Sequence, residues 1–162
     1  MIFHCFVLFV VEVVVAAAVE GVDYIFHLAA LVSVPESMEK IVECNRINAE
    51  GTIILLEEAA KAKAKKLILS TSAANYGDNP VSPKVETMTP EPKSPYSITK
   101  LDGEYYCNMF TQTGRLQTAC LRYFNVFGPR QNPKSAYAAA VPIFITKALA
   151  NEDITIFMFF LL

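Results

Sequence analysis

The sequence predicts an α/β fold in which a mostly parallel sheet is covered by helices. Two observations predict it. Short apolar runs rich in β-branched and aromatic residues alternate with longer helical patterns, which is the order of βαβ units. Small or polar residues follow these runs, at Ala29–Ala30, Ser70–Ser72 and Asn125. Because the carboxyl ends of parallel strands meet at one edge of a sheet, we expect these residues to lie along a ligand-binding rim.

The first segment, from Ile2 to Val19, is nearly all apolar. We interpret it as a buried strand with a flanking helix, or as a start displaced from the usual sequence. A membrane span needs about 20 apolar residues, and a signal peptide needs a positive region before its apolar stretch. No Lys or Arg precedes this segment, and Glu12 interrupts it, so we do not expect a membrane anchor.

The next elements are predicted to be a strand, a helix and a second strand. Residues 22–30 form a short apolar run that ends in small residues, as a buried parallel strand does. A helix is expected to begin near Ser37 and to end in the lysines of residues 61–66, which complement the helix dipole. Residues 67–71 are predicted to form the second buried strand. The apolar positions of the helix include Ile41, Ile47, Ile54, Leu55 and Ala59.

A proline-rich loop over residues 77–95 separates these elements from the next helix and strand. The helix is expected to run from Tyr96 to about Gly114, because glycine favours a helix C-cap. Residues 117–124 predict the third strand, which Gly128-Pro129-Arg130 closes.

Composition limits the classes of function. The chain has 162 residues, enough for one domain with a real core, since 53% of them are hydrophobic. The formal net charge is −2, which argues against a nucleic-acid partner. Its four cysteines have no CxxC or metal-ligand spacing. We therefore expect no metal site and a reduced, cytoplasmic setting.

Tyr96 and Lys100 lie four positions apart, on one face of the predicted helix. A positive charge beside a phenol favours the phenolate, which makes a phenol usable as a base near neutral pH. The same spacing also occurs in surface pairs of many helices. The hydroxyl-rich strand end at Ser70–Ser72 favours the catalytic interpretation, although these hydroxyls could simply bond local backbone.

Five motifs occur in an order that resembles the extended short-chain dehydrogenase/reductase family, and within it the nucleotide-sugar epimerases. They are FHLAA (26–30), NAEGT (48–52), STSAANYG (70–77), SPYSITK (94–100) and RYFNVFGPRQ (122–131). The resemblance implies a partial Rossmann-like doubly wound parallel sheet with NAD as cofactor. An atypical apolar segment (1–20) would precede the NAD-binding part (21–130), and the start of a smaller substrate lobe (131–162) would follow.

The resemblance also implies the roles of individual residues. Tyr96 would be the catalytic base, Lys100 its electrostatic partner, and Ser72 would hold the hydroxyl that is oxidised. Cofactor contacts would come from Leu28, Ala29, Ala30, Asn48 and Phe124, with Tyr96 and Lys100. Substrate contacts would come from Ser33, Ser72, Asn125 and Tyr137. Asn48 could instead bridge backbone only, Tyr137 could only pack, and His27 is more easily explained as a core histidine.

The implied reaction is epimerisation at C4 of a UDP-hexose or UDP-N-acetylhexosamine, through a 4-keto sugar. Related dehydratases place an Asp-Glu pair where this chain has Ala73-Ala74, and related decarboxylases place a Glu at the position of Ala74. Because elimination needs an acid and a base, the two alanines favour an epimerase over a dehydratase. A reductase remains an alternative. The resemblance further implies a homodimer through the helices that carry Asn48 and Tyr96.

A second class of function is an incomplete, catalytically impaired remnant or an interaction module. The 162 residues contain no GxxGxxG turn, which in this family holds the cofactor pyrophosphate. Residues 154–157 resemble the start of a further strand, after which the sequence departs from the family pattern. We therefore expect a fragment or shifted-frame product that binds NAD weakly, and calorimetric titration with NAD tests this.

Overall fold

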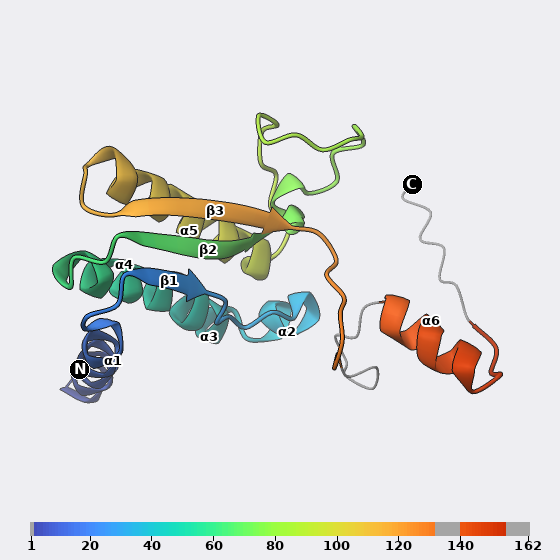
Figure 1. Cartoon of the computed structure of the whole chain (residues 1–162), viewed down its shortest axis with the longest axis horizontal. Coiled ribbons are helices and arrows are strands. Elements are labelled where there is room, and N and C mark those ends of the chain that lie inside the picture. The colour runs from blue at the N-terminus through green and yellow to red at the C-terminus, as the bar shows by residue number, and fades with distance from the viewer. Residues whose placement is uncertain (1, 132–139, 155–162) are drawn as a thin grey trace. The chain divides into compact units, whose positions relative to one another are not determined.

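The computed structural model describes residues 2–131 and 140–154, which belong to two compact units, residues 1–124 and 125–162 (Figure 1). Within its described residues, the first unit has a three-stranded parallel sheet in the order β1-β2-β3. The strands are β1 (Tyr24–His27), β2 (Lys66–Ser72) and β3 (Gln117–Tyr123). The predicted α/β class with a parallel sheet is thus confirmed, with β1 shorter than expected.

The two faces of the sheet differ in burial. Successive side chains of a strand point to opposite faces, and Leu69 lies opposite both His27 and Cys120 in the register. These three side chains therefore share a face, on which Leu69 is only 2% exposed. Phe26 belongs to the other face and is 68% exposed. The expectation that residues 22–30 form a fully buried strand is therefore wrong for one face of β1.

The core lies between the sheet and two helices, α4 (Gly51–Lys61) and α5 (Pro95–Gln112). A Cβ added at Gly103 of α5 would lie 2.9 Å from Leu69 Cδ2, so glycine lets α5 approach β2 closely. Figure 1 shows both helices beside the same face of the strands. The buried core residues are Leu56, Ala59, Leu67, Leu69, Cys107, Phe110 and Leu116.

Helix α5 begins and ends for local reasons. Ser94 and Ser97 form a capping box, in which each side chain bonds the backbone N–H of the other, and Pro95 fits the first turn. After the C-cap, Gly114 has φ of 69°, a conformation that favours glycine. The predicted helix is confirmed, and it begins one residue earlier than expected.

The expected helix from Ser37 to the lysine run is divided into several elements. They are α2 (Val34–Glu39), α3 (Ile41–Asn45), the π-helical turn η1 (Arg46–Glu50) and then α4. Helix α2 begins earlier than expected, because the Ser33 hydroxyl accepts a bond from Glu36 N and caps this helix. A π-helical turn inside a helix often marks a functional position, and Asn48 lies in this one.

The first residues of the loop before α5 contact a later part of the same loop. A short 3₁₀ helix, η2 (Ala73–Tyr76), follows β2 and ends at Gly77, whose φ is 57°. A Cβ at Gly77 would collide with the carbonyl of Glu91, and Glu91 N donates to Asn75 O at 2.8 Å. Glycine is therefore required where the loop returns toward α5.

The N-terminal segment is a single helix, α1 (Ile2–Val19), so the expected strand is wrong. Apolar runs do not distinguish a strand from a helix by pattern alone, and 18 residues exceed the usual strand length. Val13 and Val14 are exposed on it. Among the described residues, no helix combines the length and the apolar character that crossing a membrane requires.

The second unit contains α6 (Ala140–Leu149) in its described part. The further strand expected over residues 154–157 lies outside the described residues except for Ile154, which is in no helix or strand. The boundary predicted at residue 130 lies close to the division between the two units at residue 124, but no observation tests the functions assigned to the two parts.

Candidate active site

The carboxyl ends of the three strands lie side by side and form the predicted rim (Figure 1). Leu28 to Ala30 follow β1, Ser70 to Ser72 end β2, and Phe124 follows β3. Leu28 is 67% exposed and Phe124 62% exposed, so apolar surface is available on both sides of the β2 end. This is the edge at which parallel sheets bind ligands.

Tyr96 and Lys100 meet as expected from their spacing. The Lys100 ammonium lies 5.9 Å from the centre of the Tyr96 ring. It donates to the carbonyl oxygen of Ser70 at 2.9 Å, so it is fixed at the end of β2. Burial lowers the pKa of Lys100, whereas Tyr96 is only half-buried. The arrangement holds a buried positive charge beside a more accessible phenol.

The backbone of Tyr96 is also positioned by a buried hydroxyl. Tyr96 N donates to Ser37 Oγ at 3.2 Å, and Ser37 Oγ donates to Val34 O at 2.7 Å. Helix α2 therefore supports the first turn of α5. Because Ser37 lies 59 positions before Tyr96, sequence spacing gave no signal for this contact.

Ser72 is half-buried at the end of β2, where it caps η2. Its hydroxyl oxygen accepts a bond from Ala74 N at 3.1 Å, as the alternative interpretation of this junction expected. The hydroxyl proton remains available to donate. No hydrogen bond joins the Ser72 and Tyr96 hydroxyls among the described residues, so a direct link between them stays a prediction.

Asn48 is buried and fully bonded. Its Oδ1 accepts from Leu31 N at 2.8 Å, and its Nδ2 donates to Leu31 O at 3.0 Å and to Thr99 Oγ1 at 3.1 Å. It therefore connects the segment after β1 to α5, beside Lys100. These contacts agree with the interpretation that Asn48 bridges backbone, and they support the site by position.

His27 is a neutral core histidine, as expected. The Thr52 hydroxyl donates to Asn48 O, so its oxygen accepts the bond from His27 Nε2 at 2.9 Å. Burial, followed by the nearby charge of Lys100, lowers the pKa of His27 to about 4. The protonated form is therefore rare at neutral pH.

The remaining predicted residues are not brought to the rim by any observed contact. Ser33 is only 3% exposed, and its hydroxyl caps α2. Asn125 is exposed and opens the second unit. Tyr137 lies outside the described residues. Their roles in substrate binding stay predictions.

A carboxylate that the sequence did not single out anchors α5, the helix that carries Tyr96 and Lys100. The Glu104 carboxylate accepts hydrogen bonds from Arg122 Nη2 at 2.7 Å and from Arg122 Nε at 2.9 and 3.2 Å. It also accepts from Thr71 Oγ1 at 2.7 Å and from Asn75 Nδ2 at 2.8 Å. The cluster joins α5 to the ends of β2 and β3. Glu104 lies one turn after Lys100 on α5, and an acid on that inward face was the available signal.

The same cluster extends to the rim through aromatic rings. The Arg122 guanidinium lies 4.8 Å from the centre of the Tyr76 ring, and the rings of Tyr76 and Phe124 stack at 6.4 Å. The bond to Glu104 raises the pKa of Arg122, against the opposing effect of burial. The charge on Arg122 is therefore permanent. No group of three or more potential metal ligands occurs in the described part of the chain.

Comparison with known proteins agrees with the geometry. The family described as the NAD dependent epimerase/dehydratase family matches residues 11–158. The UDP-glucose 4-epimerase of Mycolicibacterium smegmatis is 37% identical over 136 residues, which cover 83% of this chain and 43% of the relative. This chain therefore spans less than half the length of that relative.

Two solved structures are similar in fold. The UDP-glucose 4-epimerase of Thermotoga maritima, solved with UDP-glucose, has a TM-score of 0.82 and 37% identity over 91% of this chain and 49% of that one. The UDP-N-acetylglucosamine 4-epimerase of Methanobrevibacter ruminantium, solved with UDP-N-acetylmuramic acid, has a TM-score of 0.80 and 40% identity over 86% and 45%.

These matches confirm the predicted family, the Rossmann-type sheet, and NAD as the cofactor of the family. They cover the strands that form the rim and the helix that carries Tyr96 and Lys100. The chain belongs to the NAD-dependent epimerase/dehydratase family.

Proposed function

We propose that this chain carries the catalytic residues of an NAD-dependent 4-epimerase acting on a nucleotide sugar, either a UDP-hexose or a UDP-N-acetylhexosamine. The observation that carries the proposal is the Tyr96 ring beside the Lys100 ammonium, which is fixed to Ser70 O at the strand rim. The names of the similar proteins, which are UDP-sugar 4-epimerases, support the substrate class.

The rim suits the nicotinamide end of NAD. Leu28 and Phe124 offer exposed apolar surface, and the small Ala29 and Ala30 let a ligand approach the backbone. When bound, NAD would accept the hydride from the sugar and return it. The chain has no GxxGxxG turn for the pyrophosphate, so we expect weak binding and test the activity at millimolar NAD.

The proton chemistry is assigned to three side chains. Tyr96 would take the proton of the sugar 4-hydroxyl and give it back after the sugar has turned over. The Lys100 ammonium would stabilise the phenolate, because it is buried and held close to the ring. Ser72 would donate its free hydroxyl proton to the sugar oxygen.

Ala73 and Ala74 favour epimerisation among the related reactions. They form the first turn of η2, immediately after Ser72, and both are half-buried. Neither side chain can remove a proton from a sugar carbon or protonate a leaving hydroxyl group, as elimination of water requires. Epimerisation needs only the base at C4.

The test is conversion of UDP-galactose and UDP-N-acetylgalactosamine by the purified chain with added NAD, followed by chromatography. We expect slow conversion of at least one sugar to its 4-epimer, dependent on NAD. Tyr96→Phe keeps the ring and removes the base, and it should abolish conversion while the fold, followed by circular dichroism, is unchanged. No conversion at millimolar NAD, or equal conversion by Tyr96→Phe, contradicts the proposal.

We further propose that a second copy of the chain binds the outer surface of α3 and α5. Val42, Ile98 and Tyr105 are 66%, 54% and 61% exposed on these two contacting helices. Exposed apolar residues on two contacting helices are typical of an interface. Light scattering should show a dimer, and Tyr105→Glu should shift it to the monomer; a monomeric wild-type chain contradicts this.

A different candidate function is that of an interaction module, as the sequence analysis allowed. The exposed face of β1 favours it, since Tyr24 and Phe26 are 58% and 68% exposed on this strand, which lies at the edge of the described sheet. Leu28, which follows the strand, is 67% exposed. The partner would be a polypeptide supplying the part of the relatives that this chain does not span. Co-expression with the part of the Thermotoga maritima enzyme that this chain does not match should give a stable complex, and failure to co-purify counts against this function.

A further inference from the structure

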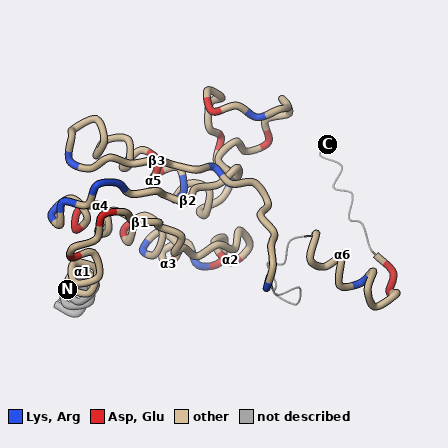
Figure 2. The backbone as a smooth tube through the Cα atoms, viewed as in Figure 1, with Lys and Arg blue, Asp and Glu red and all other residues tan. Residues whose placement is uncertain are grey.

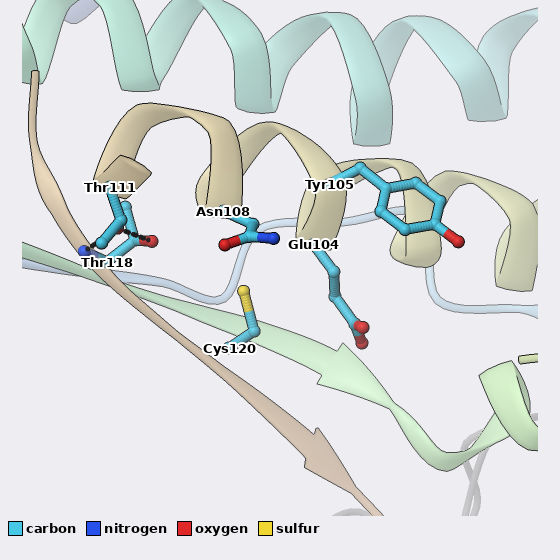
Figure 3. Close-up of a pocket in the computed structure, with 6 residues that line it drawn as sticks. All are labelled: Glu104, Tyr105, Asn108, Thr111, Thr118 and Cys120. Atoms are coloured by element: carbon cyan, nitrogen blue, oxygen red, sulfur yellow. Dashed lines mark hydrogen bonds between the residues drawn. The ribbon is translucent and has the colours of Figure 1, made fainter. Parts of the chain in front are cut away.

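The Glu104 carboxylate of α5 accepts hydrogen bonds from three other elements. At the end of β2, Thr71 Oγ1 donates to Glu104 Oε1 at 2.7 Å, and in η2, Asn75 Nδ2 donates to the same oxygen at 2.8 Å. On β3, Arg122 Nη2 donates to Glu104 Oε2 at 2.7 Å. Figure 3 shows the Glu104 side chain extending from α5 toward the strands. One carboxylate therefore joins α5 to all three elements.

Two of these donors lie on either side of Ser72 in the sequence. Thr71 precedes it and is 3% exposed, whereas Asn75 follows it in η2 and is completely buried. The two side chains also bond each other, since Asn75 Nδ2 donates to Thr71 Oγ1 at 3.1 Å. Between them, the Ser72 hydroxyl accepts a bond from Ala74 N at 3.1 Å. The position of this hydroxyl therefore depends on a turn that the Glu104 carboxylate holds against α5.

Lys100 and Glu104 hold the same strand end from successive turns of α5. Lys100 Nζ donates to Ser70 O at 2.9 Å, and Glu104 binds the next residue, Thr71. Two bonds between a helix and a strand restrict their relative movement more than one bond does. They therefore fix the helix that carries the proposed base against the strand that ends in Ser72.

The donors around Glu104 require two acceptor oxygens. Oε1 accepts from Thr71, Asn75 and Arg122 Nε, and Oε2 accepts from both Nη2 and Nε of Arg122. Glutamine has the same shape but a single acceptor oxygen, and its amide nitrogen would face N–H or O–H donors whichever way it turned. Glu104→Gln therefore keeps the volume of the side chain and loses part of the cluster.

We propose that Glu104 is a positioning residue of the active site, which sets the place of the Ser72 hydroxyl relative to the Tyr96 ring. The inference rests on the proposed function, in which Ser72 donates to the sugar oxygen and Tyr96 removes the proton of the sugar hydroxyl. Glu104 transfers no proton itself, because its side chain is only 13% exposed and both its oxygens accept bonds. A misplacement of about 1 Å can slow a reaction about 100-fold, even when no group that touches the substrate is lost.

The first test compares Glu104→Gln with the wild-type chain in the conversion of the UDP-sugar at millimolar NAD. We expect kcat to fall about 10- to 100-fold while KM for the sugar changes by less than about threefold, because the groups that contact the sugar are kept. Thr71→Val removes only the hydroxyl beside Ser72 and leaves the ion pair of Glu104 with Arg122 intact, so its expected loss of stability is smaller. It should lower kcat about tenfold.

Two controls separate positioning from other effects. Asn108 lies one turn after Glu104 on α5, is exposed and lines the same pocket (Figure 3), so Asn108→Ala changes the pocket without the cluster. Leu56→Ala removes a completely buried side chain of α4 and lowers stability alone. Under conditions in which circular dichroism shows every variant to be folded, both controls should keep the wild-type kcat.

Hydrogen exchange of the Ala74 amide tests the inference without turnover. This amide donates to Ser72 Oγ, so its exchange rate reports on the turn that holds the hydroxyl. The rate, measured by NMR, should rise about tenfold in Glu104→Gln. It should stay unchanged in Leu56→Ala, where only the amides that exchange by global unfolding become faster.

The outcomes distinguish this inference from the proposed function. A wild-type chain that converts no sugar contradicts the proposed function, and the Ala74 amide alone then decides the role of Glu104. With an active wild-type chain, an unchanged kcat in Glu104→Gln, or an equal loss of kcat in Leu56→Ala, overturns the inference. An unchanged exchange rate of the Ala74 amide in Glu104→Gln overturns it in either case. If Glu104→Gln does not fold, Thr71→Val gives both measurements.

Discussion

The two faces of the sheet differ in how far the helices bury their side chains. On the covered face, Leu69 is 2% exposed, and Thr71, on the same face of β2, donates to Glu104 of α5. On the other face, Phe26 is 68% exposed and Tyr24 58% exposed. Both faces are built from alternating residues of the same three strands. The difference indicates that the described helices stabilise one face only, and that the site is held from that side.

The ion pairs also differ in burial between two regions of the molecule. Figure 2 shows basic residues gathered at the turn between α4 and β2, which lies at the amino end of β2 and away from the carboxyl ends that form the rim. The salt bridge of Lys65 with Asp23 in this region is well exposed. The pair Glu104–Arg122 is instead mostly buried, and it lies between α5 and the strands. Exposed pairs contribute little to stability, whereas loss of one partner from a buried pair is costly.

Among changes to charged and titratable residues, the largest effect is expected where the Glu104–Arg122 pair is broken. Glu104→Ala leaves Arg122 charged and unpaired, and it removes an acceptor from Thr71 and Asn75. We expect a loss of about 3 kcal/mol in the free energy of unfolding, measured with urea. Asp23→Ala removes an exposed partner and is the matched control, with a loss below about 1 kcal/mol. Equal losses in the two variants would contradict the account.

The next effect comes from pH. The pKa of His27 falls from 6.5 to about 4 on folding, so the unfolded chain binds more protons between these values. The stability from the neutral histidine is therefore full above pH 6.5, decreases as pH falls, and is lost near pH 4. Its size is roughly 3 kcal/mol. His27→Gln should flatten this part of the urea-derived stability profile, and an unchanged slope would refute the burial argument.

Two glycines sharpen the comparison, because only one faces the sheet. A methyl group at Gly103 would press on Leu69, and Gly103→Ala should cost about 1–3 kcal/mol. At Gly51 in α4, the nearest atom would be at an ordinary 3.6 Å, so Gly51→Ala should stabilise the chain by about 0.5–1 kcal/mol. Thermal unfolding of both variants measures whether each substitution lowers or raises the stability. A stabilised Gly103→Ala variant would show that α5 does not depend on this close approach.

The smallest effect is expected on the open face. Phe26→Thr places a β-branched residue with high strand propensity in β1 and removes exposed apolar surface, so the free energy of unfolding should change by no more than about 0.5 kcal/mol. Leu69→Ala, on the covered face of β2, should cost about 2–5 kcal/mol in the same urea measurement. A large loss in Phe26→Thr would mean that this face is covered after all.

The sequence predicted the elements whose signals are local. Gly114 predicted the end of α5, because a C-cap depends on neighbouring residues, and the end of the proline-rich loop placed the start of the helix within one residue. The rim could be predicted because strand ends in a parallel sheet must meet at one edge. The Tyr96–Lys100 pair followed from helical spacing alone.

The elements that were missed depend on contacts distant in the sequence. An apolar run cannot by itself distinguish the helix α1 from a strand. The bonds of Glu104 to Asn75 and Arg122 span 29 and 18 positions, so no local pattern contained them. The π-helical turn at Asn48 likewise reflects the buried bonds of one side chain to Leu31 and Thr99.

The measurement that tests the central proposal most directly follows the hydrogen at C4 of the sugar. The chain is incubated at millimolar NAD with a UDP-sugar deuterated at C4, and the product is analysed by mass spectrometry and NMR. If Tyr96 and Lys100 serve a 4-epimerase, the product is the 4-epimer and retains deuterium at C4, because the hydride returns to the carbon it left. Deuterium on another carbon of the product would contradict the proposed function, and so would formation of the 4-epimer by the Tyr96→Phe variant.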